Sequence, residues 1–168
     1  MVKEIKMVAL LSEAERDNLE GLVKRAISFY RSAGKDIALA EFMNSSGQFV
    51  RGDHYIFAMD LNGVMLAHPI NERFVGLNFL NFRDSDGRSF IREIVENATH
   101  KGSGFAEYRW YHPASEDELL KTIYYEKIDS TIICGGFYRS KEHDSESCFE
   151  PGGDYPANFF ELLNYLGV

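Results

Sequence analysis

The polar and aromatic side chains best suited to binding a small molecule lie on segments with the two-residue period of β-strands. Residues 105–112 place tyrosine, tryptophan and histidine on one face, and residues 121–128 place a lysine on one face of a second segment. A third segment, 54–59, alternates Tyr55 and Phe57 with other residues. Small-molecule pockets are mostly apolar and aromatic with a few convergent polar groups, so these faces together predict a binding pocket.

The same alternation raises a geometric conflict. Lys121 lies on one face of a regular strand, and Tyr124 lies on the other, because successive side chains point to opposite sides. A β-bulge would bring both side chains to one face. The alternative interpretation is that the aromatic rings are core residues beneath a helix, and that the amine of Lys121 extends outward to water.

Known enzyme signatures are absent from the sequence. It has no G-x-S-x-G elbow, no phosphate-binding glycine loop and no G-x-G-x-x-G after a strand. The acidic pair Asp84/Asp86 and the pair at 116–117 lie in predicted turns. We therefore predict a protein that is not an enzyme, with no catalytic residue and no cofactor. An enzyme using His68, Lys121 or the tyrosines as acid–base groups stays open as an alternative.

Composition limits the classes of partner and the compartment. The 168 residues carry 18 basic and 26 acidic side chains, a formal charge of −8, without a basic run, so we expect no nucleic acid partner. The two cysteines allow at most one disulfide, and the five scattered histidines lack metal-ligand spacing, so no metal site is predicted. Without a signal peptide or transmembrane segment, the sequence as written predicts a cytoplasmic protein, or an extracytoplasmic one if it is an excised receptor domain.

The elements that position these side chains follow an α+β order. Ser12 and Glu15 form the capping box of a long helix that continues to about residue 32. The elements predicted after it are a helix at 36–43, strands at 54–59 and 64–68, an irregular apolar segment at 70–87, a helix at 89–100, strands at 105–112, 121–128 and 131–138, and a helix at 157–166. Hairpin-joined strands predict one five-stranded antiparallel sheet with helices on one face. We assign residues 1–140 to one domain and residues 141–168 to a polar tail that ends in the short helix.

Several short motifs occur in order between about residue 20 and residue 138. The motifs are Tyr55 to Gly63 with Ala67-His68-Pro69 (Y-x-F-x-x-D-x-x-G…A-H-P), Gly76-Leu77-Asn78 followed by residues 84–88 (G-x-N…D-x-x-G-K, with arginine in place of lysine), Gly104 to Trp110 (G-x-x-x-Y-x-W), Lys121 to Tyr125 (K-x-x-Y), and residues 133–138 with their closing G-x-Y. Together they resemble the single Cache domains, a family of PAS-like extracytoplasmic sensors.

The resemblance implies a fold and a function. The implied fold is a long N-terminal helix packed on a five- to six-stranded antiparallel sheet, with a pocket between the sheet and a covering loop. The implied function is signal transduction, as in chemotaxis, by binding a small organic acid such as acetate, propionate, lactate or pyruvate. Carried over residue by residue, the positions expected at the pocket are Tyr55, Phe57, His68, Tyr108, Trp110, Lys121 and Tyr124. Lys121 would pair with the carboxylate, and the rings would enclose the alkyl end.

Members of this family usually lie between two transmembrane helices and act on a kinase or chemotaxis module. The sequence as written shows neither feature, so two interpretations stay open: a free-standing soluble binder, or a module that signals through a partner protein. The apolar stripe of the N-terminal helix also predicts a homodimer. The competing hypothesis is a protein–protein interaction domain whose aromatic residues are all core.

Overall fold

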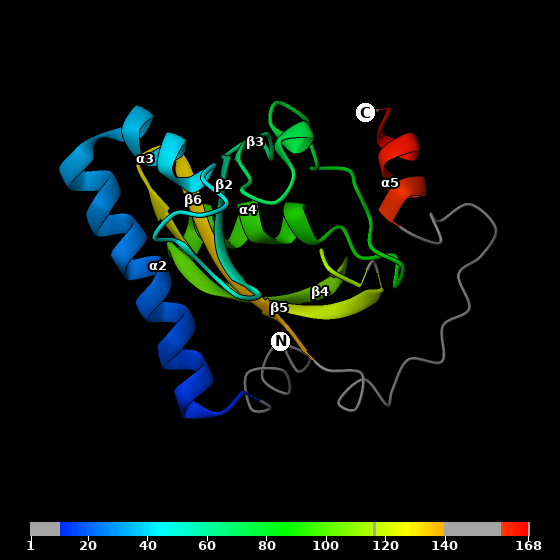
Figure 1. Ribbon diagram of the computed structural model, residues 1–168, viewed down its shortest axis with the longest axis horizontal. Coiled ribbons are helices and arrows are strands. Elements are labelled where there is room, and N and C mark those ends of the chain that lie inside the picture. Colours follow the sequence, from blue (N-terminus) through cyan, green and yellow to red (C-terminus); the bar gives the residue numbers. More distant parts are fainter. Residues whose placement is uncertain (1–10, 116, 140–158, 168) are drawn as a thin grey trace.

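A computed structural model describes residues 11–115, 117–139 and 159–167 of the chain. Its elements in order are α2 (Glu13–Ala33), α3 (Lys35–Phe42), β1 (Val50–Arg51), β2 (His54–Asp60), β3 (Met65–Ala67), the 3-10 turn η1 (Glu72–Phe74), α4 (Phe90–Lys101), β4 (Ser103–Tyr111), β5 (Glu118–Ile128), β6 (Thr131–Tyr138) and α5 (Phe159–Leu166). Figure 1 shows the helices packed around the sheet that the strands form. The predicted α+β fold class is confirmed. The hairpin between β4 and β5 is shorter than predicted, because β5 begins at Glu118.

The six strands form one antiparallel sheet in the order β1-β2-β6-β5-β4, and β3 also pairs with β2. The strand that comes last in the sequence, β6, therefore lies between β2 and β5. The register of β5 places Lys121 opposite Tyr108 of β4 and opposite Tyr138 of β6. Strand pairing alone thus brings three side chains with polar tips next to one another.

Helix α2 covers one face of the sheet. It begins at the predicted capping box, in which the Ser12 hydroxyl accepts from the Glu15 N–H at 3.1 Å and the Glu15 carboxylate accepts from the Ser12 N–H at 2.8 Å. It ends at Gly34, whose φ of 91° is readily adopted only without a side chain. The buried stripe that packs on the sheet consists of Leu19, Leu22, Val23, Ala26, Ile27 and Tyr30.

This stripe is the basis of the predicted homodimer. Because it is buried inside the chain, a dimer through α2 would use the outer face of the helix, where Asp17, Lys24 and Arg25 are exposed. The apolar stripe therefore gives the homodimer prediction no support.

The opposite face of the sheet is covered by α4 and by residues 68–89, the segment between β3 and α4. Figure 1 shows α2 on the left of the sheet and this cover on the other side. The segment is irregular, as predicted, and is anchored by the buried rings of Phe74, Phe79 and Phe82. These three rings thus form part of the core.

The prediction that all helices lie on one face of the sheet is wrong. Strand β2 alternates Tyr55 and Phe57, which belong to the cluster under α4, with Ile56 and Ala58, which belong to the cluster under α2. Both faces of the strand are apolar, so both require cover.

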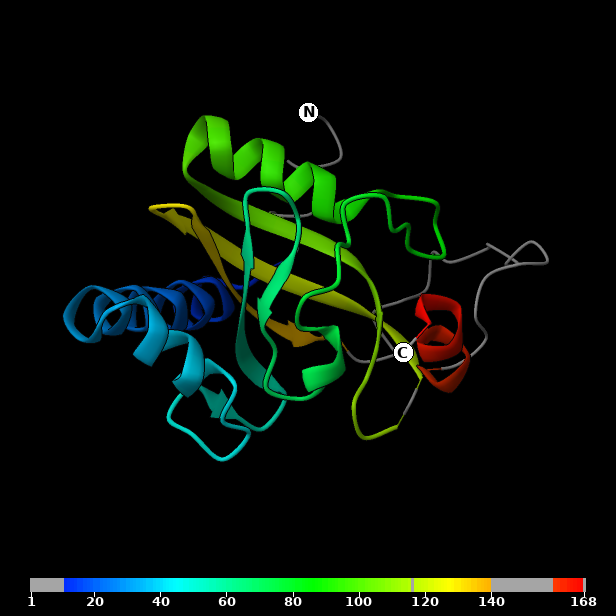
Figure 2. The same ribbon diagram turned by 90° about the horizontal axis from the view of Figure 1, so that it is seen from above.

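Helix α5 adds to the cluster under α4 through the buried side chains of Leu162 and Leu163. Figure 2 shows it beside the hairpin end of β4 and β5. The terminal helix is thereby confirmed for residues 159–166. Its predicted start at residue 157 and the polar segment 141–158 lie outside the described residues, and the division into a domain and a tail stays a prediction.

Two consecutive glycines of β6 allow close approach on both faces of the sheet. A Cβ atom on Gly135 would lie 2.9 Å from Cγ2 of Val23 and 3.2 Å from Cδ1 of Ile56. A Cβ atom on Gly136 would lie 2.6 Å from Cγ2 of Ile123. Helix α2 therefore packs directly on the backbone of the central strand.

Substitution of Gly135 by alanine tests this packing. We expect Gly135→Ala to lower the free energy of unfolding by about 1–3 kcal/mol, because the methyl group overpacks the contact with α2. The matched control is Gly21→Ala in α2, where the new Cβ meets only Nη1 of Arg25 at 3.5 Å. This control gains helix propensity and is expected to raise stability by up to about 1 kcal/mol. Urea unfolding measures both, and an unchanged midpoint for Gly135→Ala would contradict the close packing.

Candidate functional site

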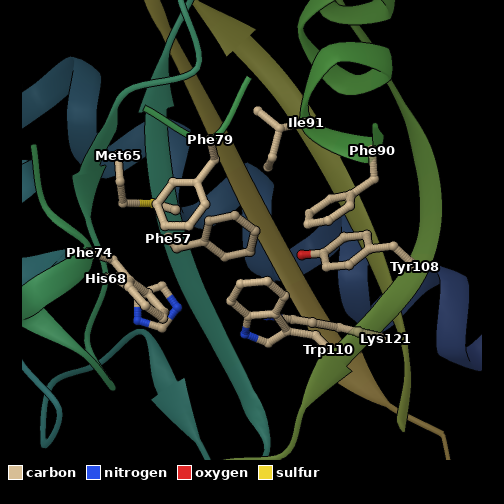
Figure 3. A pocket seen from close by; sticks show the side chains of 10 residues that line it. All are labelled: Phe57, Met65, His68, Phe74, Phe79, Phe90, Ile91, Tyr108, Trp110 and Lys121. Carbon is tan, nitrogen blue, oxygen red and sulfur yellow. The ribbon is translucent and has the colours of Figure 1, made fainter. Parts of the chain in front are cut away.

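A small internal cavity lies between the sheet and the cover formed by residues 68–89 and α4. Figure 3 shows its lining, which is Phe57, Met65, His68, Phe74, Phe79, Phe90, Ile91, Tyr108, Trp110 and Lys121. The space open to the centre of a water molecule is about 20 Å³. This is room for little more than one water molecule, so the rings nearly fill the site.

The amine of Lys121 is the most unusual group at this cavity. The residue is 1% exposed, and its Nζ donates a hydrogen bond to the Tyr55 hydroxyl at 2.7 Å. Nζ also lies over three aromatic rings, at 4.3 Å from the centroid of Tyr55, 4.7 Å from that of Phe57 and 5.3 Å from that of Tyr138. No carboxylate of the described residues pairs with it.

Burial governs the charge of this amine. Removal from water disfavours the ammonium form and lowers the pKa of Lys121 to about 7, while the nearby Cys134 acts weakly in the opposite direction. Burial also raises the pKa of the Cys134 thiol, so that residue is an un-ionised part of the core. The predicted outward extension of the lysine, the alternative interpretation of the sequence, is therefore wrong.

A chain of hydrogen bonds leads away from the amine. The Tyr55 and Tyr138 hydroxyls lie 3.1 Å apart, and the Tyr138 hydroxyl donates to the carbonyl oxygen of Tyr111 at 3.1 Å. Since Tyr138 has one hydroxyl hydrogen and gives it to Tyr111, Tyr55 must donate to Tyr138 and accept from Lys121. The hydroxyl hydrogens of Tyr55 and Tyr138 are thus both assigned, and the Tyr55 oxygen accepts from the amine.

Two further donors at the cavity have no acceptor among the described residues. Tyr108 is 3% exposed and stacks on Phe90, with ring centroids 4.0 Å apart, and Figure 3 shows its hydroxyl pointing into the cavity. Neither this hydroxyl nor the indole N–H of Trp110 makes a hydrogen bond within the described part of the chain. Both groups are hydrogen-bond donors and line the cavity, so both can donate to a ligand there.

His68 adds a third donor. Its Nδ1 accepts from the Asn71 backbone N–H at 3.1 Å, and burial followed by the charge of Lys121 lowers its pKa well below the usual value. The ring is thus neutral, and the hydrogen resides on Nε2. The polar groups of the lining are therefore hydroxyl, amine, indole and imidazole groups, with no carboxylate among them.

The structure brings together five of the seven predicted site residues as cavity lining. They are Phe57, His68, Tyr108, Trp110 and Lys121. Tyr55 lies one layer behind, where its hydroxyl holds the lysine amine.

The prediction that Tyr124 faces the pocket is wrong. Its ring packs against Phe105 at 5.1 Å between centroids, in the cluster under α2, and its hydroxyl donates to Glu126 at 3.1 Å. The pairings of β5 with β4 and β6 run without interruption past this position, so there is no bulge to change its face.

Several important residues were not among the predicted site positions. Phe74 and Phe79 close the cavity from the covering segment, and their only signal in the sequence is an apolar side chain in an irregular region. Tyr138 shares the cavity-side face of β6, and its signal was the aromatic end of the closing G-x-Y motif. Neither signal indicates contact with Lys121 before the sheet order is known.

The acidic turn at residues 84–88 has a structural role. The Asp84 carboxylate accepts from the backbone N–H groups of Asp86, Arg88 and Arg109 at 3.1, 2.9 and 3.3 Å. These bonds fasten the covering segment to β4. Among the described residues, no group of three or more histidine, cysteine, aspartate or glutamate side chains is arranged to hold a metal ion.

Comparison with known proteins assigns the family. Residues 31–142 match the model of the family described as single Cache domain 2. The chain belongs to the single Cache domain family. The fold predicted from the sequence motifs is therefore confirmed.

Two curated relatives are signalling proteins. The chain is 32% identical over 88 residues to the methyl-accepting chemotaxis protein McpP of Pseudomonas putida, covering 51% of this chain and 16% of the relative. It is 32% identical over 122 residues to the sensor histidine kinase MctS of Rhizobium johnstonii, covering 70% of this chain and 26% of the relative. The matched part is thus a small fraction of each relative. In the part of this chain that the structure describes, no helix has both the length and the apolar character needed to cross a membrane.

Two solved structures resemble this Cache domain. One is a Cache chemosensory domain studied for carboxylic acid recognition, with a TM-score of 0.59, 26% identity, and coverage of 74% of this chain and 88% of that one. The other is a methyl-accepting chemotaxis protein of Vibrio parahaemolyticus, with a TM-score of 0.66, 20% identity, and coverage of 81% and 93%. At 20% identity, the similarity to the Vibrio parahaemolyticus protein supports the fold alone.

Substitution of Lys121 by methionine tests whether the buried amine costs stability. Lys121→Met removes the ionisable group and keeps much of the volume, so we expect the free energy of unfolding to rise by about 1–4 kcal/mol near pH 6. The amine pKa is about 7 in the folded chain and about 10.4 in the unfolded chain. The unfolded chain therefore binds more protons between these values, and wild-type stability recovers as the pH rises.

The advantage of Lys121→Met should accordingly shrink between about pH 7 and pH 9 in urea unfolding. The matched control is Lys24→Met, whose side chain is 57% exposed, and we expect little change in stability at any of these pH values. A Lys121→Met variant less stable than the wild type at pH 6 would show that the amine is well compensated.

Proposed function

We propose that this chain is the ligand-binding sensor domain of a signalling system, and that it binds a short carboxylate in the cavity beside Lys121. The observation that carries the proposal is a fully buried lysine amine with no carboxylate partner in the described residues. Removal from water costs an ion several kcal/mol, and an unpaired charge does not recover that cost. A bound carboxylate would supply the missing charge.

The remaining polar groups of the cavity support the same class of ligand. An ionised carboxylate only accepts hydrogen bonds, and the amine of Lys121, the hydroxyl of Tyr108 and the indole N–H of Trp110 can all donate. Hydrogen bonds to a charged group contribute about 1.5–3 kcal/mol each, more than bonds between neutral groups. The lining contains no carboxylate that could neutralise a cationic ligand.

The apolar lining favours a short alkyl end. With about 20 Å³ open, an acid of acetate or propionate size requires the rings to move apart. Phe74 and Phe79 belong to the covering segment, which is joined to Gly63 and Met65 by backbone hydrogen bonds, so enlargement of the cavity would require these two rings to turn or the segment to move together with β3. Binding would in this way be linked to a displacement of the cover.

The relatives support the signalling part of the proposal. A chemotaxis receptor and a sensor histidine kinase share about a third of their matched residues with this chain, and a 26% identical Cache domain recognises carboxylic acids. We therefore propose a non-catalytic role, an output through a kinase or chemotaxis module, and a position outside the cytoplasm, as in the sensors that the sequence resembles.

A thermal-shift and calorimetric series with acetate, propionate, lactate and pyruvate tests the proposal. A ligand at 100-fold its Kd stabilises the folded chain by about 2.7 kcal/mol. We expect Lys121→Met to abolish binding, and Tyr108→Phe to weaken it about 10- to 100-fold through loss of one hydrogen bond to the carboxylate.

The control for these variants is Tyr124→Phe, because this hydroxyl lies on the α2 side of the sheet. It should leave the affinity unchanged. Full affinity in Lys121→Met, or equal losses in Tyr108→Phe and Tyr124→Phe, would refute the assigned site.

A further inference from the structure

We propose that carboxylate binding at this site takes up one proton on Lys121, so that above neutral pH the domain responds to the undissociated acid rather than to the total carboxylate. This inference rests on the proposed function. It concerns how the same site is regulated by pH.

The surroundings of the amine carry no charge that would hold it in the ammonium form. The groups that face it are Tyr55 and Phe57 from β2, His68 from the segment after β3, Tyr108 from β4, and Cys134 and Tyr138 from β6. Helix α4 contributes only apolar side chains, Phe90 and Ile91, to the cavity. Toward the surface, Nε2 of His112 lies 3.1 Å from a carboxylate oxygen of Asp53, and the His112 ring contacts the ring of Tyr138.

Each titratable neighbour is neutral near pH 7. Burial raises the pKa of Tyr55, Tyr108, Tyr138 and the Cys134 thiol, and it lowers the pKa of His68. The amine is therefore the one group in this described set whose charge changes between about pH 6 and pH 9.

A bound carboxylate shifts the protonation equilibrium of the Lys121 amine toward the ammonium form. The neutral amine, a proton and the carboxylate combine into an ammonium–carboxylate pair, and no covalent bond forms or breaks except the new N–H bond. In a site closed to water, this pairing favours the charged form strongly. Binding and proton uptake are then one linked equilibrium.

The linkage has a quantitative form. Above the pKa of the free amine, each pH unit reduces the observed affinity for carboxylate by about tenfold, because a proton must be supplied for every ligand bound. The product of the proton and carboxylate concentrations is proportional to the concentration of the undissociated acid. Affinity expressed against the undissociated acid should therefore be constant across this range.

Calorimetry of the wild-type chain with propionate provides the test. Titrations at about pH 6, 7, 8 and 9, each in two buffers with different ionisation enthalpies, give the number of protons taken up per ligand. We expect this number to rise from near zero at pH 6 to near one at pH 9, and the affinity to fall about tenfold per pH unit above pH 7.

Variants identify the group that titrates. Lys121→Arg keeps a charge at every pH, so its affinity should be flat and its proton uptake zero. Tyr124→Phe and His68→Gln should keep the wild-type slope, because the first lies on the other face and the second replaces a ring that is neutral throughout. If Lys121→Arg fails to fold or bind, the number of protons that the wild-type chain takes up per propionate at pH 9 tests the inference by itself.

The possible results separate this inference from the proposed function. Propionate binding with equal affinity at pH 6 and pH 9 and no proton exchange would overturn the inference and leave the carboxylate site intact. A slope that persists in Lys121→Arg would assign the proton to another group and also overturn it. Absence of binding at pH 6, where the amine is charged, would overturn the proposed function as well.

Discussion

The structure depends on how a single lysine amine is accommodated inside an apolar interior. The ammonium form of Lys121 receives one hydrogen bond acceptor and three ring faces, and the described residues supply no opposite charge. These contacts reduce the free-energy cost of burying the ammonium group but do not cancel it. Hydrophobic packing elsewhere in the domain must offset the remainder.

Alternate residues of β5 point to opposite faces of the sheet, and the two faces differ in what they contact. Lys121, Ile123 and Tyr125 point toward the cavity and the α4 cover, and Thr122, Tyr124 and Glu126 point toward the side of α2. Strand β2 makes the same division with Tyr55 and Phe57 against their neighbours. Helix α2 thus packs on one face of the sheet, and the polar groups of the cavity lie on the other face.

Much of the fold followed from local patterns. The capping box at Ser12 marked the start of the long helix, and the hairpin spacing predicted the antiparallel pairing of β5 with β4 and with β6. The family motifs identified five of the residues that line the cavity. These features are recorded within short stretches of sequence, so a single sequence suffices to recognise them.

The remainder depends on contacts between distant residues. The bond between Tyr55 and Tyr138 joins residues 83 positions apart, and it exists because β6 inserts beside β2. Tyr124 was wrongly placed at the pocket because it matches the tyrosine of the K-x-x-Y motif. The unbroken register of β5 points its side chain to the opposite face of the sheet from Lys121. Cavity size is equally inaccessible to sequence patterns, since it is the small difference between the backbone spacing and the volume of many rings.

The glycine at position 135 has a mechanical consequence for this arrangement. With no side chain between β6 and Val23 of α2, there is no compressible layer to absorb a displacement of the strand. A shift of β6 normal to the sheet would therefore press directly on the side chain of Val23. The central strand of the sheet and the longest helix of the described residues are therefore in direct contact.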